Sequence, residues 1–460
     1  MPDAGIPVTR DDLTLSSAGP ASPAPALRRE LRLWDLVLFN VTAVAGVRGL
    51  VFMARAGSGI VTLCLFAAVA FFLPSAFAMI RLTSQYPEQG GMYVWTKETF
   101  GQWHGFLCAW FYFVSNVLFY PALLLTGVAI AAYVGGDGSG FVNDKPLVLI
   151  ITIAVLWILA LLNVTGLKTV KWVSNLGAIC TIAIPALVGA LAILIGVRHG
   201  SATRFTALPE FSLGTVKYWA SIALAFTGLE LAPIAAGEVV NPRVNIRRAV
   251  WISAAICTLF YVIGTAALLV LSPVSQLDLV TGIAHVAYTA SLRLHMHWIS
   301  PLLAVLISVS MIGSLGSYLA GNSRLPPAIG LNRHLPAGLS RLHPRWQTPY
   351  VSILLQSLVS TVFLLLAQSG EVLQTGYHLL VDLVTIATLV PFLYIFRAAF
   401  RSGGRWAGAV GGAVTALGVI VVAIPPPEAE PWRYMAKVLG GCVLFTLAGR
   451  WLFVSSSRPR

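Results

Sequence analysis

A carboxylate placed in an apolar stretch is the first feature of this chain that could do chemistry. Glu230 lies inside the apolar run 219–236, with Gly228 two residues before it and Pro233 three residues after it. A charge near the centre of a bilayer costs roughly 2.5–3.5 kcal/mol even on insertion scales, so it usually faces a cavity and has a partner. Gly and Pro beside it favour a break in the helix, which frees backbone N–H and C=O groups to bind a ligand. These residues predict a polar site at mid-membrane depth.

Arg48 is the second charge in an apolar stretch. It lies between Gly46 and Gly49, about 12 residues into the range 36–54, which is roughly 18 Å of helix. One interpretation is that its long side chain extends to the membrane interface. The interpretation that we favour is that Arg48 lines a central cavity. There it would pair either with Glu230 or with an anionic group of a ligand.

Three polar side chains recur with helical spacing in the range 104–133. Tyr112, Asn116 and Tyr120 are four residues apart, so they share one face of a helix. Polar side chains often join helices inside membranes, and packing is one interpretation. The other is that aromatic and amide groups recognise a small zwitterion, in which case Asn116 and Tyr120 bind it.

Two further sets of polar residues each have two interpretations. His378 and Asp382 are also four residues apart, and such a pair could relay protons. Alternatively, Asp382 caps or bonds a neighbouring helix. Ser314, Ser317 and Asn322 could help to coordinate Na⁺ or allow close helix packing, and we favour packing.

Membrane-spanning helices must position these residues. The 460 residues are 57% hydrophobic and 10% charged, whereas soluble domains are about 25% charged. Runs of about 20 apolar residues suit helices that cross roughly 30 Å of hydrocarbon, and they lack the alternation of a β-barrel. We predict an all-α polytopic membrane protein with twelve transmembrane helices. Their approximate ranges are 36–54, 60–80, 104–133, 147–165, 173–196, 217–237, 248–271, 298–320, 349–368, 374–397, 407–424 and 433–453.

The distribution of basic residues supports this count. With the N-terminus in the cytoplasm, 21 Lys and Arg residues fall on the inner side and 8 on the outer side, as the positive-inside rule requires. We therefore predict a multi-pass protein of the cell membrane with both termini cytoplasmic. The net charge of +13 is spread over short loops, which argues against a nucleic-acid partner.

Composition also divides the chain. Residues 1–30 are rich in Pro, Ala and Ser and lack the order of a cleavable signal, so we predict a disordered cytoplasmic tail. Residues 31–455 form the single transmembrane domain, and 456–460 form a second tail.

The five cysteines fall in apolar runs and are predicted to be small buried hydrophobes. No metal-ligand spacing or phosphate-binding loop occurs, so neither an enzyme nor a cofactor is predicted.

The two expected helix breaks occupy matching positions. One lies at residues 46–49 in the first span and the other around 228–230 in the sixth, and each opens a block of five helices. Because five is odd, consecutive blocks have opposite orientations in the membrane. Interrupted helices at matching positions of inverted halves indicate a transporter binding site. The repeats would cover about 36–196 and 217–397, with helices 11 and 12 at about 407–453.

Three stretches resemble the amino acid–polyamine–organocation (APC) superfamily. Residues 86–101, YPEQGGMYVWTKETFG, are similar to its loop between helices 2 and 3. AFTGLE at 225–230, followed by GEVVNPR at 237–243, is similar to its helix 6 and the next loop. LLVDL at 379–383 with PFLY at 391–394, and also GVRG at 46–49, resembles the glutamate/GABA-antiporter branch. With the span count, the resemblance covers residues from about 30 to 455.

The resemblance implies a LeuT-like fold, with helices 1 and 6 interrupted and a site between helices 1, 3, 6, 8 and 10. Phe226, Thr227 and Gly228 then correspond to helix-6 residues that bind substrate, and Glu230 to a proton sensor behind them. Two departures affect the substrate. Arg48 stands in the segment where many relatives have Gly-Ser-Gly, and Leu224 stands where some exchangers have a Trp gate.

We therefore predict a secondary active transporter for amino acids or related amines. Half-helix N-termini would hold the substrate carboxylate and carbonyl ends its ammonium, with Phe226 covering it. Gly46, Arg48 and Gly49 would line the site. Titratable groups within the spans favour H⁺ coupling or exchange over Na⁺. The alternatives are a non-transporting sensor or scaffold on the same fold and a Na⁺-coupled symporter. The substrate and the oligomeric state stay open.

Overall fold

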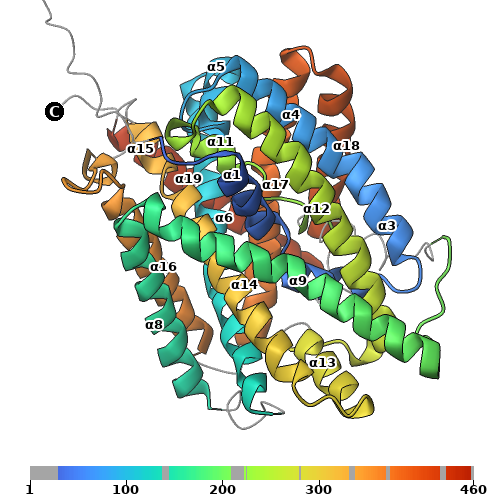
Figure 1. The fold of residues 1–460 in the computed structure, drawn as a ribbon. Coiled ribbons are helices and arrows are strands. Elements are labelled where there is room, and N and C mark those ends of the chain that lie inside the picture. The colour runs from blue at the N-terminus through green and yellow to red at the C-terminus, as the bar shows by residue number, and fades with distance from the viewer. Residues whose placement is uncertain are drawn as a thin grey trace, which may run out of the picture.

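The computed structural model describes residues 29–136, 144–208, 222–278 apart from Leu224, 281–330, 337–368, 373–424 and 431–456. These residues form helices, together with an isolated parallel bridge between Leu31 and Val239. Figure 1 shows most of the long helices side by side, with α5 and α15 at one end of the molecule and α13 at the other. We call these the α5 end and the α13 end.

His378 and Asp382 belong to a helix, but their side chains lie outside the described part.

The first half of the chain contains the elements α1 (Leu33–Val44), α2 (Val47–Ala54), α3 (Ile60–Ala67), the π-helix η2 (Ala68–Phe72), α4 (Leu73–Gln85), α5 (Met92–Phe100), α6 (Gln102–Ala131), the 3-10 helix η3 (Ala132–Gly135), α8 (Lys145–Val164) and α9 (Leu167–His199). The second half contains α11 (Leu231–Ile234), η4 (Ala236–Glu238), α12 (Pro242–Leu271), η5 (Val274–Gln276), α13 (Gly282–Arg293), α14 (Ile299–Asn322), α15 (Leu325–Gly330), η6 (Ala337–Ser340), α16 (Tyr350–Gln368), α17 (Leu373–Arg401), α18 (Arg405–Ala423) and α19 (Pro431–Ser456).

All twelve predicted ranges coincide with helical elements where they are described. Within the described residues, seven helices are long and apolar enough to cross a membrane, and α1 with α2 makes an eighth span if that bent pair is counted as one. Helices α16, α18 and α19 contain shorter apolar segments, so the count of twelve stays a prediction. Short helices α5, α13 and α15 lie between the predicted spans, in stretches for which the sequence predicts loops. At 9 and 12 residues, α5 and α13 are too short to span.

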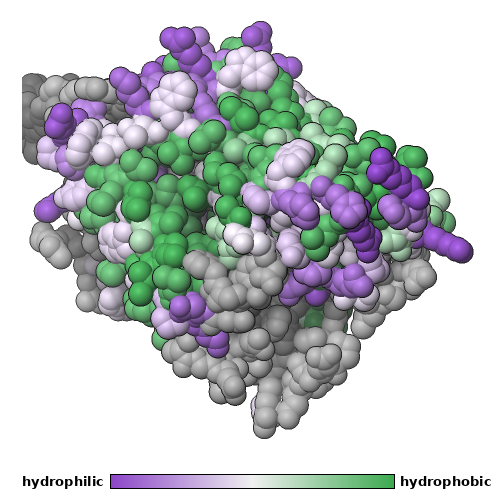
Figure 2. Space-filling view, turned by 60° about the horizontal axis from the view of Figure 1, so that its bottom comes forward, coloured by the Kyte–Doolittle hydropathy of each residue, from purple (hydrophilic) through white to green (hydrophobic). Residues whose placement is uncertain are grey.

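The outer surface is that of a membrane protein. Figure 2 shows hydrophobic residues covering much of the described surface, with hydrophilic residues gathered toward its edges. Large apolar side chains on α8 and α9 are exposed, among them Ile150, Ile158, Ile193 and Val197. In water such an extended apolar surface would be unfavourable, so these faces are suited to contact lipid. The cysteines are free thiols, four of them buried and Cys442 half-buried.

The first helix break lies earlier than the sequence predicted. Helix α1 ends at Val44, and α2 begins at Val47 with its axis turned by 41°. Only Ala45 and Gly46 are non-helical, with Gly46 in an extended conformation. Arg48 and Gly49 are predicted to lie in the break but belong to the first turn of α2. Neither residue needs a special backbone conformation there.

The second break lies where it was predicted, between Phe226 and Glu230. Gly228 has a φ of 126°, and a Cβ atom built on it would lie 2.9 Å from the carbonyl carbon of Ala43. The backbones of the two breaks therefore touch at a point where no side chain fits. Helix α11 after this break has four residues, Leu231–Ile234.

Substitution of Gly228 tests this contact. Gly228→Ala should lower the melting temperature of the purified protein more than Gly57→Ala. Both glycines have positive φ, which costs an L residue roughly 1–2 kcal/mol, but nothing lies within 4 Å of a Cβ built on Gly57. The extra clash at Gly228 should add about 1–3 kcal/mol. Equal melting shifts for the two variants would contradict the close approach.

Candidate functional site

A cavity lies beside the two breaks. Its volume is about 180 Å³, which holds on the order of ten water molecules and hence a small solute. Helices α1, α2, α6, α12, α14, α16 and α17 surround it, together with the segment 225–230. The charged side chains among its described lining residues are Arg48 and Glu230. The sequence prediction of a polar site at the breaks thus corresponds to a real cavity.

The carboxylate of Glu230 is bonded at both oxygens. The hydroxyl of Tyr112 on α6 donates to Oε1 at 2.9 Å, and the backbone N–H of Gly228 donates to Oε2 at 2.8 Å. The side chain is 1% exposed. Among the described ion pairs none joins Arg48 to Glu230, and both interpretations of Arg48 stay predictions.

Tyr261 on α12 joins both breaks. The N–H of Gly46 donates to its hydroxyl at 3.1 Å, and the hydroxyl oxygen lies 2.6 Å from the carbonyl of Val44 and 2.8 Å from that of Ala225. Its single proton can serve one carbonyl at a time. Tyr318 on α14 donates to the carbonyl of Ala43 at 2.9 Å. Sequence reasoning missed both tyrosines, although a hydroxyl in the middle of an apolar span was a usable signal.

Arg48 lines the cavity together with Gly46 and Gly49. Its guanidinium carbon lies 5.8 Å from the ring centre of Phe52, one turn further along α2. Gly49 is needed for packing, because a Cβ atom there would lie 2.8 Å from the ring of Tyr261. Gly49 therefore lets α2 approach α12 closely, whereas a Cβ atom on Gly46 would make only an ordinary contact with Tyr261, at 3.9 Å.

Asn116 lines the cavity, but Tyr120 does not. The amide nitrogen of Asn116 donates to the carbonyl of Tyr112 on its own helix at 2.8 Å. The hydroxyl of Tyr120 instead donates into a buried cluster, 3.0 Å from Oε1 of Gln356. Eight residues rotate a helix by about 80°, whereas seven rotate it by only about 20°. Phe119 therefore occupies the cavity face, and the prediction that Tyr120 binds substrate is not supported.

Of the three predicted helix-6 residues, only Thr227 faces the cavity. Phe226 is not among the described lining residues, and its ring centre lies 4.8 Å from that of Phe72 and 5.0 Å from that of Tyr261. Phe226 therefore does not cover a ligand in this conformation. Gly228 contacts the backbone of α1 instead. The unwound backbone rotates neighbouring side chains in directions that a helical register does not predict.

The serines of α14 bond neighbouring helices. Ser314 donates to the carbonyl of Thr42 at 2.6 Å, and Ser317 to the hydroxyl of Ser174 at 3.0 Å. Asn322 donates to Oε1 of Gln356 at 2.9 Å. These contacts agree with the packing interpretation. From α17 the described lining residues are Val384, Thr385 and Thr388.

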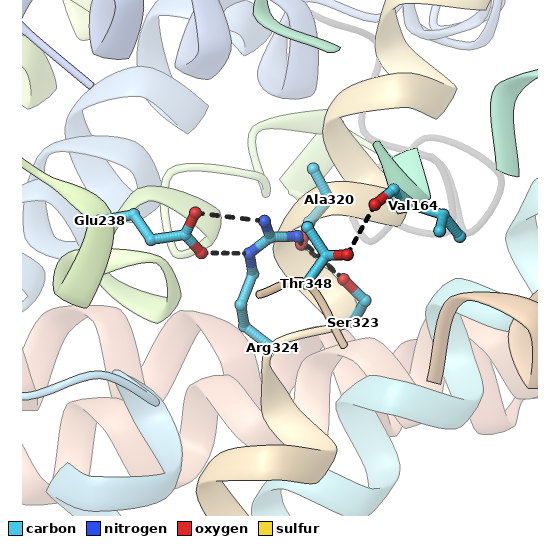
Figure 3. Close-up of polar contacts among 6 residues, drawn as sticks. All are labelled: Val164, Glu238, Ala320, Ser323, Arg324 and Thr348. Atoms are coloured by element: carbon cyan, nitrogen blue, oxygen red, sulfur yellow. Dashed lines mark hydrogen bonds and ion pairs between the residues drawn. The ribbon is translucent and has the colours of Figure 1, made fainter. Parts of the chain in front are cut away.

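A buried ion pair lies at the α5 end (Figure 3). Glu238 of η4 accepts from Nε of Arg324 at 2.7 Å and from its Nη2 at 3.4 Å. The remaining nitrogen, Nη1, donates to the carbonyl of Ala320 at 2.5 Å and to the hydroxyl of Ser323 at 3.0 Å. Arg324 is 1% exposed. The sequence does not show that these two segments meet, so this pair was not predicted.

The first described residues of the chain bond to the segment that contains Glu238. The N–H groups of Glu30 and Leu31 donate to the carbonyl of Glu238 at 2.9 and 3.1 Å, and Val240 donates to Leu31 at 3.0 Å. The N–H of Gly90, in the turn before α5, donates to the carbonyl of Ile234 at 3.1 Å. Segment 231–240 is thus bonded by residues 30–31, by Gly90 and by Arg324. The GEVVNPR motif and the Gly90–Gly91 turn both take part in this closure.

Comparison of the sequence with known protein families shows the family of this chain. The sequence profile of the amino acid permease family matches residues 31–424. The chain belongs to the amino acid permease family. It is a transporter of amino acids, and its motifs agree with the predicted APC superfamily. The narrower glutamate/GABA branch stays a prediction.

Two relatives and one solved structure show the extent of the likeness. This permease is 27% identical over 460 residues to an uncharacterized transporter of Legionella pneumophila, covering 93% of this chain and 97% of that protein. It is 27% identical over 335 residues to the serine/threonine exchanger SteT of Bacillus subtilis, covering 71% and 73% of the two chains. The crystal structure of MhsT in complex with L-phenylalanine matches with a TM-score of 0.60 at 12% identity, covering 91% and 99%. The predicted LeuT-like fold is confirmed.

Tyr261 provides a test of how the breaks are held. Tyr261→Phe should lower both the melting temperature and the affinity for transported amino acids, since it removes the hydrogen bonds that connect backbone groups of the two breaks. A hydrogen bond of this kind contributes about 0.5–1.5 kcal/mol. Tyr288→Phe on α13, away from the breaks, is the control. Unchanged stability and affinity in Tyr261→Phe would show that the tyrosine is dispensable.

Proposed function

We propose that this permease is a secondary active transporter that works by alternating access and is driven by H⁺ coupling or by exchange. The observation that carries the proposal is the pair of touching helix breaks beside a cavity. Interrupted helices around a mid-membrane site are typical of such transporters. Amino acids or closely related amines are the substrates, and the lipid bilayer is the surrounding partner.

The polarity of the breaks suits a zwitterion. The N-terminus of α2 opens on the cavity at Gly46, where the partial positive charge of a helix end favours a carboxylate. The carbonyls of Ala43 and Val44 end α1 beside the same cavity. Each carbonyl has two lone pairs, so the tyrosine hydroxyls leave capacity for an ammonium group.

The two ends of the permease differ in closure. The lining residues Phe52, Leu125 and Phe363 lie in the later halves of α2, α6 and α16, toward the α13 end. The α5 end is sealed by Glu238, Arg324 and the strand-like segment at Leu31. The positive-inside rule assigns the α5 end to the cytoplasm of the cell. The conformation is then closed to the cytoplasm, and inward opening must separate these contacts.

Glu230 is the group that we assign to proton coupling. It is titratable, lines the cavity and bonds the moving break through Gly228. Protonation would remove the charge that holds the Gly228 N–H and so would alter the break. His378 and Asp382 on α17 are retained as further coupling candidates. A Na⁺-coupled symporter and a non-transporting sensor on the same fold are the alternatives.

Transport in proteoliposomes tests this assignment. We expect amino acid uptake to rise with an inwardly directed proton gradient and to be independent of Na⁺. In Glu230→Gln the proton gradient should lose its effect, while exchange of amino acid between the two sides continues. Glu98→Gln, an exposed change, is the control. Uptake that requires Na⁺ and ignores pH would reject proton coupling, and binding without any flux would favour a sensor.

The ion pair at the α5 end gives a separate prediction. Removing one partner leaves a buried uncompensated charge, which costs about 3–5 kcal/mol. Glu238→Gln should therefore favour inward opening and raise the rate at which a membrane-impermeant maleimide labels Asn40→Cys from the cytoplasmic side, since Asn40 is fully buried on α1. Glu98→Gln, which breaks the exposed pair with Lys97, should leave labelling unchanged. Equal rates in both variants would show that the buried pair does not resist opening.

A further inference from the structure

We propose that an outer surface of the bundle, where α4 and α12 meet the start of α18, binds the headgroup of an anionic phospholipid. Four arginines and three aromatic residues form this surface, namely Phe77, Arg81, Arg247, Arg248, Trp251, Arg405 and Trp406. We call it the arginine–tryptophan surface. None of these residues lines the cavity beside the breaks, so the inference goes beyond the proposed function and does not depend on it.

Three aromatic rings from three helices lie at the base of this surface. Helix α4 packs against both α12 and α18, and Figure 1 shows the three helices on the same side of the molecule. The ring centre of Phe77 lies 4.8 Å from that of Trp251 and 4.9 Å from that of Trp406, edge-on in both pairs. Phe77 is 40% exposed and Trp406 is 51% exposed. Exposed aromatic rings on membrane proteins typically lie near the level of the lipid headgroups.

Arginines on α4 and α12 lie about one helical turn nearer the α5 end than these rings. Arg81 follows Phe77 by four residues on α4, which runs toward that end. Arg247 and Arg248 precede Trp251 by four and three residues on α12, which begins at that end. Residues three and four apart are neighbours on one face of a helix. The arginines therefore lie between the rings and the polar end of the molecule.

Arg81 also lies against the start of α18. Its Nε donates to the carbonyl of Ser402 at 2.8 Å, and its Nη2 donates to the same carbonyl. Its Cδ lies 3.1 Å from a Cβ atom built on Gly404, the residue that precedes α18. Within the described residues no side chain caps this helix, so its first backbone N–H groups can bind an anion. Arg405 is the first residue of α18 and brings another guanidinium to the same place.

Acidic side chains do not balance the charge of this surface. All four arginines are exposed, and no ion pair among the described residues includes any of them. A phosphate group can accept two parallel bonds from a guanidinium, and basic pockets between transmembrane helices bind anionic lipid headgroups. An anionic phospholipid fits the whole surface, because its phosphate meets the arginines while its acyl chains cover the aromatic rings. A soluble phosphate would use the arginines alone.

Native mass spectrometry of the purified full-length permease measures this binding. We would titrate the protein in neutral detergent with phosphatidylglycerol and with phosphatidylcholine of the same acyl chains. A basic residue beside an anionic lipid strengthens binding by about fivefold, so the wild type should prefer phosphatidylglycerol by more than about tenfold. The double variant Arg247→Gln/Arg405→Gln should bind phosphatidylglycerol about 10- to 30-fold more weakly. Its affinity for phosphatidylcholine should stay unchanged.

Arg341→Gln/Arg345→Gln is the matched control. Both arginines are exposed and precede α16, which lies on another side of the molecule from α18 (Figure 1). The control removes the same charge and should keep the wild-type affinity for phosphatidylglycerol. If the tested double variant does not fold, Arg247→Gln and Arg405→Gln are measured singly, and each should lose about fivefold.

Three results would overturn the inference. The first is equal affinity of the wild type for the two lipids. The second is an equal loss of phosphatidylglycerol affinity in the control, because net charge alone would then explain the binding. The third is displacement of phosphatidylglycerol by millimolar glycerol 3-phosphate, which has no acyl chains and would show a site for soluble phosphate. Transport is not measured in any of these experiments, so their outcome is independent of the proposed function.

Discussion

The contact between the two broken helices is the constraint on which the rest of this structure depends. Breaking a helix inside a membrane exposes backbone N–H and C=O groups that lipid cannot satisfy. Here the breaks are placed against each other, with Gly228 touching the backbone of Ala43 and Val44. The hydroxyls of Tyr261 and Tyr318 bond the freed groups at the first break. The surrounding helices are arranged so that these side chains reach the same point.

Several polar side chains of the core both line the cavity and hold the helices together. Tyr261, Tyr318 and Ser314 bond backbone carbonyls of α1 and also line the cavity, whereas Tyr120 bonds Gln356 away from it. Arg48, Asn116 and Thr227 line the cavity as well. Glu230 lines the cavity and bonds the second break. A change in its protonation would therefore reach the site and the backbone together.

Closure of the α5 end depends on a different kind of interaction. Arg324 and Glu238 form a buried, doubly bonded pair that is also tied to the backbone near Leu31. Such a pair adds little net stability over an apolar contact. If its partners are pulled apart while they remain buried, however, each charge loses its partner before water can solvate it, which is costly. That property favours two discrete arrangements, closed or fully solvated, over a gradual opening. It suits a device that must switch between the two sides of a membrane.

The helix break at Gly228 was predictable from the sequence, because the cost of intramembrane charge and the meaning of Gly and Pro are local. Glu230 and Arg48 line the cavity beside the breaks, and their roles there stay predictions. Tyr120 and Phe226 are not among the lining residues, and the physical reason differs: a rotation of about 80° over eight residues turns Tyr120 away from Tyr112, whereas Phe226 lies in unwound backbone. Nothing in the local pattern specifies either.

The amino-acid sequence by itself determined that this chain crosses a membrane as helices, which of them are interrupted, and where charges enter the apolar region. Those properties follow from composition and from the backbone chemistry of single segments. Only the tertiary structure decided that Tyr261 joins both breaks, that Arg324 meets Glu238, and that Glu230 is bonded to Tyr112 instead of Arg48. These are pairings between segments from about 35 to more than 200 residues apart, and they depend on how the helices pack together.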